Sequence, residues 1–144
     1  MLRRVFIVFF IGLLAAHGRA EEPTTNAPAK NWVLPLFTAE GFRSMTLRGT
    51  EVRPVSDTRI DIVDMNITVF TGGAAAKVES VLLSPAASFF PKEQIARGRS
   101  SVRLLRDDLE MNGEQWTYDH AAKKVSIAQG GRVSFAAQMP DLLK

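Results

Sequence analysis

The sequence contains no cysteine. This absence excludes disulfides, thiol nucleophiles and zinc–thiolate sites, so a fold made by this chain has to be held together by an apolar core. Histidine is almost as scarce, because only His17 and His120 occur among 144 residues. A metal site needs several ligands from histidine, aspartate or glutamate, and a single histidine in the body of the chain gives it no starting point. We therefore expect no metal and no cofactor.

The chain also lacks an apolar run long enough for an ordinary membrane-spanning helix, which needs about 20 residues. The apolar run at residues 5–16 is shorter; two arginines precede it, and small residues, Gly18 and Ala20, follow it. This is the pattern of a secretory signal with its cleavage site. Residues 1–20 are therefore predicted to be a cleaved export signal, with an uncleaved N-terminal membrane anchor as the alternative.

Without this signal, the chain has no excess of positive or negative charge. Residues 1–20 hold three of the 18 basic residues and none of the 15 acidic residues, which leaves 15 of each. The mature chain would therefore carry a formal net charge of zero. A nucleic-acid-binding domain is expected to have a basic excess or stripe, and this chain has neither. We expect an exported protein with no nucleic-acid partner.

The rest of the chain has no convincing helical period and is dominated by alternation of apolar and polar residues. Residues 21–38 are predicted to be a tether, whose apolar patch at 32–37 docks on the fold or forms an edge segment. The alternation predicts one all-β domain over residues 39–139, followed by a short tail at 140–144. Short strands with turn residues between them predict a meander over residues 102–135.

The same pattern predicts details of the strands. The alternation shifts by one residue at Val63, which is typical of a β-bulge. Gly49 is predicted to end a strand, and the pairs at 72–73, 112–113 and 130–131 are predicted to lie in turns because they contain glycine or asparagine. One face of the strand after the first of these turns is predicted to hold Val81, Leu83, Pro85, Ala87 and Phe89.

Candidate catalytic groups are few. His120 is predicted to lie in a turn between two strands, where an imidazole is normally solvated. The carboxylates of Asp107, Asp108 and Glu110 could form a glycosidase pair, but their place in a polar turn favours a structural role. We therefore predict that the protein is not an enzyme, and a small secreted hydrolase using Asp107, Asp108 or His120 is the alternative.

The alternating apolar residues would line one face of a curved sheet. This face is predicted to contain Met45, Leu47, Ile60, Ile62, Met65, Ile67, Val69, Leu104, Leu109, Met111, Trp116, Tyr118, Val125, Ile127, Val133 and Phe135. The ordinary interpretation is a closed sandwich core. The sharper interpretation is a trough for acyl chains, since each buried CH₂ contributes about 0.8 kcal/mol. Periodicity alone does not distinguish a closed core from a trough.

Three stretches carry a resemblance to a known family. They are MNITVF at 65–70, SPAASFFPKEQIARGRSSVRLLRDD at 84–108 and LEMNGEQWTYDHAAKKVSI at 109–127. The last contains a Tyr-Asp pair, a basic pair and a valine-containing strand. With these stretches, the segment from about 42 to 135 resembles the LptC/LptA (OstA-like) family of periplasmic lipopolysaccharide export proteins. The motifs are periodic and contain no catalytic signature.

The resemblance implies a half-open β-jellyroll, a folded-over sheet that holds lipid A acyl chains and catalyses no reaction. The inward positions that best match the family's strands, and that we predict to line the lipid groove, are Met65, Ile67, Val69, Trp116, Tyr118, Val125 and Ile127. The resemblance also implies lipopolysaccharide as ligand. The implied protein partners are the inner-membrane ABC transporter and other Lpt proteins joined edge to edge in a bridge to the outer membrane.

The resemblance leaves two branches of the family open. The cleavable N-terminus is similar to LptA, whereas the LptC branch usually keeps a membrane anchor. The periplasm is the expected location in both cases, with inner-membrane association in the second. A secreted β-sandwich that recognises a protein or a glycan through its loops is the alternative function.

Overall fold

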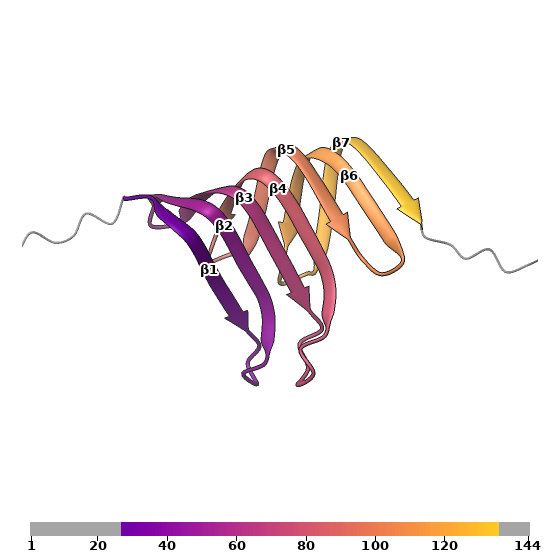
Figure 1. Ribbon diagram of the computed structural model, residues 1–144, viewed down its shortest axis with the longest axis horizontal. Coiled ribbons are helices and arrows are strands. Elements are labelled where there is room, and N and C mark those ends of the chain that lie inside the picture. The colour runs from indigo at the N-terminus through magenta and orange to yellow at the C-terminus, as the bar shows by residue number, and fades with distance from the viewer. Residues whose placement is uncertain (1–26, 136–144) are drawn as a thin grey trace, which may run out of the picture.

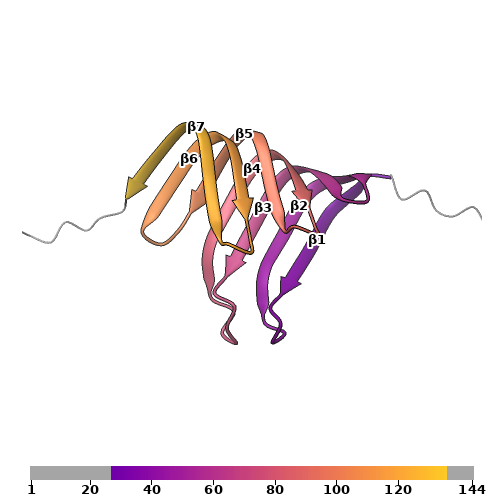
Figure 2. The ribbon, with the colours of Figure 1, turned by 180° about the vertical axis from the view of Figure 1, so that it is seen from behind.

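The computed structural model describes residues 27–135, and these residues form one seven-stranded antiparallel β-sheet (Figure 1). The strands are β1 (Ala29–Phe37), β2 (Arg43–Ser56), β3 (Arg59–Phe70), β4 (Val78–Phe90), β5 (Ile95–Leu105), β6 (Leu109–Asp119) and β7 (Lys124–Phe135). They lie in sequence order, so that β1 and β7 are the two edges (Figure 2). The predicted all-β class and the meander are confirmed. None of the described segments is a helix that could cross a membrane.

Strand β1 lies within residues 21–38, the segment predicted to be a tether. Its alternate residues Trp32, Leu34 and Leu36 are partly buried against the core. Pro35 is tolerated because a proline on an edge strand can leave its missing N–H on the unpaired side. The apolar patch thus forms an edge strand, one of the two arrangements expected for it. The predicted export signal at residues 1–20 and the tail at 140–144 lie outside the described residues.

Residues with positive φ interrupt several strands. They include Asn31 (φ 51°) in β1, Asp64 (50°) in β3, Gln115 (51°) in β6 and Gly130 (60°) in β7. A residue in this conformation inside a strand leaves the ladder locally unpaired and bends the strand. Non-glycine residues adopt it at a steric cost, so the surrounding pairing has to hold them in place.

These interruptions lie at about the same level of the sheet, although Gly130 of β7 falls opposite Gly113 and not directly opposite Gln115. Asn31 falls opposite Thr50, and Asp64 falls opposite Pro85, because the pairs on either side of each are in register. The Thr50 hydroxyl donates to Asp64 Oδ2 at 3.0 Å, which ties β2 to β3 at this level. We call the resulting row the fold line; it consists of Asn31, Thr50, Asp64, Pro85, Arg99, Ser100, Gln115 and Gly130.

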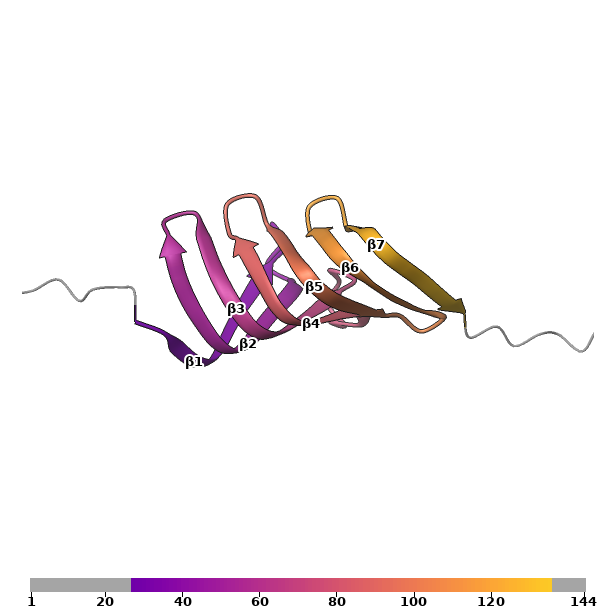
Figure 3. The same cartoon turned by 90° about the horizontal axis from the view of Figure 1, so that it is seen from above.

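The fold line divides the sheet into two walls. The first wall contains residues 32–37, 43–48, 66–70, 78–84, 101–105, 109–113 and 131–135, and the second contains 51–56, 59–63, 86–90, 95–98, 116–119 and 124–128. Figure 3 shows the β2–β3, β4–β5 and β6–β7 turns in a row at the outer end of the second wall. Met45 and Leu47 on the first wall and Phe89 on the second are at most 1% exposed. A single open layer cannot bury side chains this fully, so the walls face each other.

Turn-forming residues within strands account for three wrong sequence predictions. Gly49 lies inside β2 and does not end it, while 112–113 and 130–131 lie inside β6 and β7 and not in turns. Only the pair at 72–73 lies in a turn, as predicted. Among the glycines inside these strands, only Gly130 adopts the positive φ of a turn residue, and it bends β7. Gly49 and Gly113 are needed for close packing, because a Cβ there would collide with the side chains of Ile62 and Ile127 on the neighbouring strands.

The fold line also reverses which residues face inward. In β4 the buried side chains are Leu82 and Ser84 before it and Ala87 and Phe89 after it. Ala87 and Phe89 face the core as predicted. The prediction is wrong for Val81, Leu83 and Pro85, because the bulge at Pro85 shifts the alternation by one residue.

The shift predicted at Val63 is observed, whereas two residues predicted to face inward, Val133 and Phe135, are exposed. Val63 is 46% exposed, since the shift predicted at this residue brings Ile62 and Met65 inward and leaves Val63 and Asp64 outward. Val133 and Phe135 are 44% and 70% exposed. They lie beyond the fold line on the edge strand β7, where the described chain does not cover them.

A glycine next to the fold line permits close packing between β5 and β6. A Cβ on Gly98 would lie 2.7 Å from Trp116 Nε1 and 2.9 Å from the Ala86 carbonyl oxygen. Both distances are too short for a real side chain, so only glycine lets the indole pack against β5. Trp116 is consequently 1% exposed and is the largest fully buried side chain of the core.

Candidate functional site

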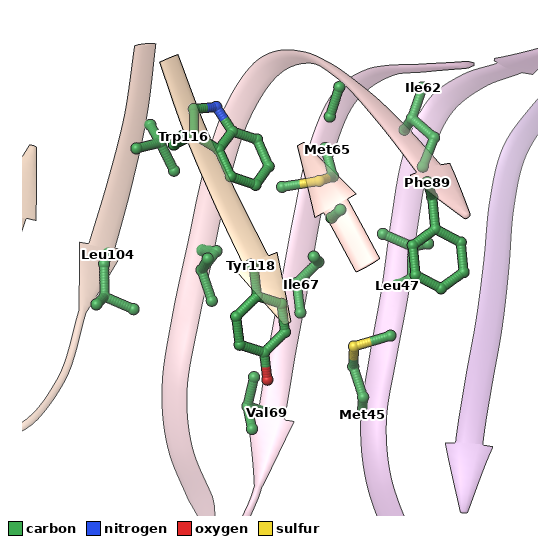
Figure 4. Close-up of a cluster of buried hydrophobic side chains, with 14 of the residues drawn as sticks. Met45, Leu47, Ile62, Met65, Ile67, Val69, Phe89, Leu104, Trp116 and Tyr118 are labelled. Atoms are coloured by element: carbon green, nitrogen blue, oxygen red, sulfur yellow. The ribbon is translucent and has the colours of Figure 1, made fainter. Parts of the chain in front are cut away.

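Five of the seven predicted groove residues lie deep between the walls. Met65, Ile67 and Val69 alternate along β3 and are at most 2% exposed, and Trp116 and Tyr118 of β6 are 1% and 3% exposed. Figure 4 shows the two aromatic side chains extending from β6 toward the row on β3. The structure brings these five side chains together in one apolar cluster.

The other two predicted groove residues, Val125 and Ile127, lie on β7 at the margin of this cluster. They are partly buried and pack against it together with Met111 of β6. The side chains of β1 at the opposite edge are also only partly buried. The interior is therefore filled by the protein's own side chains in the middle and is less densely covered toward both edge strands.

Several core residues were not predicted as groove residues. They are Val52, Leu82, Ala96 and Val102, together with Phe89 on the second wall. Leu82 was missed because the alternation was followed through Pro85 without a shift. The proline itself was the available signal, since proline inside a strand marks an edge or a bulge and β4 is flanked on both sides.

Side chains of the turn between β6 and β7, at the outer end of the second wall, contact the first wall. His120 is 7% exposed, and its Nδ1 lies 2.8 Å from the Tyr118 hydroxyl oxygen. Its Nε2 lies 3.1 Å from the Ser44 hydroxyl oxygen. Ser44 belongs to β2 on the first wall, whereas Tyr118 belongs to β6 on the second. The expectation of a solvated turn histidine is therefore wrong: the imidazole is buried and bridges the walls.

A lysine in the same turn makes a second connection between the walls. Lys123 Nζ lies 3.1 Å from Glu79 Oε2 and 3.4 Å from the Phe70 carbonyl oxygen, both on the first wall. The His120 backbone N–H donates to the Gln94 carbonyl at 3.0 Å, which holds the turn to its own wall. We call the cross-wall contacts the latch; it consists of Ser44, Glu79, Tyr118, His120 and Lys123.

Burial favours the uncharged forms of His120 and Tyr118 in the latch. It lowers the pKa of His120, and the nearby positive charge of Lys123 lowers it further, against a smaller opposing effect of Asp119. Burial also raises the pKa of the Tyr118 hydroxyl, with the negative charges of Glu79 and Asp119 acting in the same direction. Both groups are neutral at pH 7. With the tyrosine hydroxyl donating to Nδ1, the Nε2–H donates to Ser44.

Ser44 and His120 have the spacing of a nucleophile and its base, but their surroundings differ from those of a hydrolase. The group on Nδ1 is a neutral tyrosine, whereas a catalytic triad places there a carboxylate that stabilises the imidazolium. Asp107 and Asp108 lie in the exposed turn between β5 and β6. Within residues 27–135, no carboxylate hydrogen-bonds to His120, so the contacts fit a structural bridge.

A small hollow opens beside the latch, between the two walls. Its volume is about 170 Å³, which is room for about six water-sized groups. It is lined by Val69, Glu79, Ser80, Leu104, Arg106 and Met111 on the first wall and its margin and by Tyr118, Lys123 and Val125 on the second. The hollow thus combines apolar side chains with three charged ones.

A much larger hollow lies elsewhere and is not the predicted groove. It has a volume of about 1410 Å³ and is bordered mainly by outward residues of the second wall, among them Arg59, Asp61 and Arg97. Arg59 Nε lies 2.9 Å from Asp61 Oδ1, and this hydrogen bond lowers the pKa of the Asp61 carboxyl. Ser88 also donates to Asp61, at 2.8 Å. These charged and hydrogen-bonded side chains, mixed with apolar ones, suit the outside of a sheet rather than a lipid site.

Comparisons with known proteins identify the fold. No protein family and no curated protein matches the sequence. Among solved structures, the chain is similar to LptH of Pseudomonas aeruginosa, the LptA-homologous periplasmic component of the conserved lipopolysaccharide transport device. The TM-score is 0.52 at 11% sequence identity, and the match covers 78% of this chain and 94% of the LptH chain. The predicted half-open β-jellyroll is confirmed as the fold.

Proposed function

We propose that this protein is a periplasmic component of lipopolysaccharide export that binds lipid A acyl chains between its two walls. The observation that carries the proposal is an apolar interior inside a folded-over sheet whose fold is that of LptH. Burial of an acyl chain there would release its CH₂ groups from water, at about 0.8 kcal/mol each. The proposed lining residues are Met65, Ile67, Val69, Trp116, Tyr118, Val125 and Ile127. The role involves no catalytic step.

Access to this interior requires movement. Met65, Ile67, Val69, Trp116 and Tyr118 are at most 3% exposed, so an acyl chain reaches them only when the walls move apart. The walls are joined covalently only through the bent strands, and Val125 and Ile127 of β7 are the only proposed lining residues that are not fully buried. The proposal therefore places the first contact of the acyl chain at the β7 end.

The proposed partners are the neighbouring proteins of the export bridge and its inner-membrane ABC transporter. Within the described part of the chain, β1 and β7 each pair on one side only. An unpaired edge can accept a strand from a second protein, and without such a partner it is an aggregation hazard. Pro35 removes one donor from β1, whereas β7 contains no proline. Strand addition at β7 is the better supported of the two.

Export to the periplasm by residues 1–20 completes the proposal, and the anchored arrangement of the LptC branch is its variant. Site-specific photo-crosslinking in cells tests the ligand. A photoreactive residue at the inward Val125 is expected to trap lipopolysaccharide, whereas the same residue at the exposed neighbour Ser126 is not. At the exposed Ser134 of β7, the expected adduct is a protein.

Two results would contradict the proposal. The first is the absence of lipopolysaccharide adducts at both Val125 and Ile127. The second is equal labelling at Val125 and Ser126, because adjacent strand residues point to opposite faces and only one of them faces the interior. Protein adducts at Ser134 without lipid adducts at the inward positions would favour a binding module for proteins.

A further inference from the structure

The hollow beside the latch leads directly into the core. Val69 and Leu104 in its lining are core residues at 2% and 6% exposure. Met111 and Val125, which complete its apolar surface, pack against the same core. An acyl chain that enters here would contact apolar side chains along its whole path, from the margin at β7 to the row on β3.

The charged residues of the hollow lie where the apolar surface ends. Lys123 pairs with Glu79, and their side chains are 43% and 33% exposed. Arg106 is exposed, and among the described residues it forms no ion pair. Asp107 and Asp108 follow Arg106 in the chain but do not line the hollow. Its lining therefore carries two cations and one carboxylate.

This combination favours one class of ligand. An apolar hollow with an excess of positive charge at its end suits an amphiphile whose head group is anionic. A guanidinium pairs well with phosphate because its planar donors match two phosphate oxygens. A fatty acid or a neutral acyl lipid would use only the apolar part of the hollow.

Three members of the latch, Glu79, Tyr118 and Lys123, line this hollow. Between the walls the latch makes one hydrogen bond between neutral side chains, one partly exposed ion pair and one long hydrogen bond from Lys123 to the Phe70 carbonyl, which are weak compared with a packed core. Separation of Ser44 from His120 and of Glu79 from Lys123 would let the walls part at their outer ends. Separation of the Glu79–Lys123 ion pair would also free the Lys123 ammonium group for an anionic ligand.

We propose that this hollow is the entrance for an acyl lipid with a phosphate head group, that Arg106 and Lys123 bind the phosphate, and that the latch opens to admit the acyl chain. The inference rests on the proposed function and adds to it the place of entry and the class of head group.

A covalent link across the latch tests the entrance. The chain has no cysteine, so thiol reagents react only at introduced positions. The variant Ser44→Cys with His120→Cys places thiols on both walls, and a short bifunctional thiol reagent replaces the imidazole bridge. The matched control is Gln94→Cys with His120→Cys, which links two turns of the same wall and also lacks His120. Binding of fluorescent lysophosphatidic acid is measured for both.

The cross-wall link is expected to reduce binding at least tenfold relative to the control link. Equal binding by the two linked proteins would overturn the inference while leaving the proposed function intact. Failure of the unlinked protein to bind acyl lipids at all would overturn the proposed function and the inference with it.

The head-group site is tested with two lipids that differ only in phosphate, lysophosphatidic acid and monoacylglycerol. Arg106→Gln is expected to weaken binding of the phosphorylated lipid about tenfold and to leave binding of the neutral lipid unchanged. The control is Arg132→Gln, an exposed arginine on β7 that does not line the hollow. Equal effects of Arg106→Gln on both lipids, or no effect on either, would overturn the assignment of the phosphate to Arg106.

Discussion

His120 connects the walls through its contact with Ser44, and burial favours the uncharged form of its imidazole. Because burial lowers the pKa of His120, the folded protein takes up a proton less readily than the unfolded chain. The folded state is therefore favoured above the ordinary histidine pKa of about 6.5, and this advantage is lost as the pH falls from there toward the lowered pKa.

The variant His120→Gln tests this dependence. We expect the free energy of unfolding of the unmodified protein to fall between pH 7.5 and 5.5, and that of the variant to stay nearly level, as measured by urea titration at each pH. Asp61→Asn serves as the control. The pKa of Asp61 is lowered mainly by its hydrogen bond from Arg59, so its stabilising effect is lost only near and below pH 4. An unchanged slope in His120→Gln between pH 7.5 and 5.5 would contradict the latch.

The role of His120 lay beyond sequence prediction for a specific reason. Its partner Ser44 is 76 positions away in the sequence, and the contact exists only because the sheet folds over. The turn between 119 and 124 was predicted correctly from local residues. Burial of that turn depends on the opposite wall, about which the local residues carry no information.

At the scale of the strand, the fold line determines the shape of the molecule. Gln115 combines an exposed side chain with positive φ in the middle of β6, so its conformation is separable from side-chain packing. The prediction is that Gln115→Val destabilises the protein by about 1–2 kcal/mol, because a β-branched residue is costly at positive φ. Gln115→Gly is expected to stay within about 0.5 kcal/mol, since glycine tolerates this conformation.

Chemical denaturation of both variants measures the difference. Thr117→Val, two residues along the same strand, is the control for valine in β6 and is expected to have a small effect. General strand propensity predicts that valine at position 115 stabilises the protein. A more stable Gln115→Val variant would therefore contradict a bend at this residue.

The strands were largely predictable from alternation, and their bends were not. The inward positions Met65, Ile67 and Val69 follow from a period of two because they lie on one side of the fold line. Val133 and Phe135 follow the same period on β7 but are exposed. Alternation identifies residues that share a face, whereas coverage of that face depends on the opposite wall.

At the scale of the whole molecule, a single sheet supplies both surfaces of its own core. The first and second walls bury Met45 and Trp116 almost completely, yet the described chain leaves the outer sides of β1 and β7 unpaired. An interior closed by side chains and open at its edges can take up a guest by separating its walls without unfolding its strands. This property connects the fold to the proposed binding of lipid.

The most direct test is the position of a bound acyl chain relative to the methionine methyl groups. Met45 and Met65 are at most 1% exposed, and Met111 lies partly buried at the margin. An NMR titration of methyl-labelled protein with a phosphorylated lipid carrying a spin label on its acyl chain reports these distances, with the unlabelled lipid as control. The account predicts strong broadening of the Met65 and Met111 signals. Bound lipid that leaves both signals sharp would contradict it.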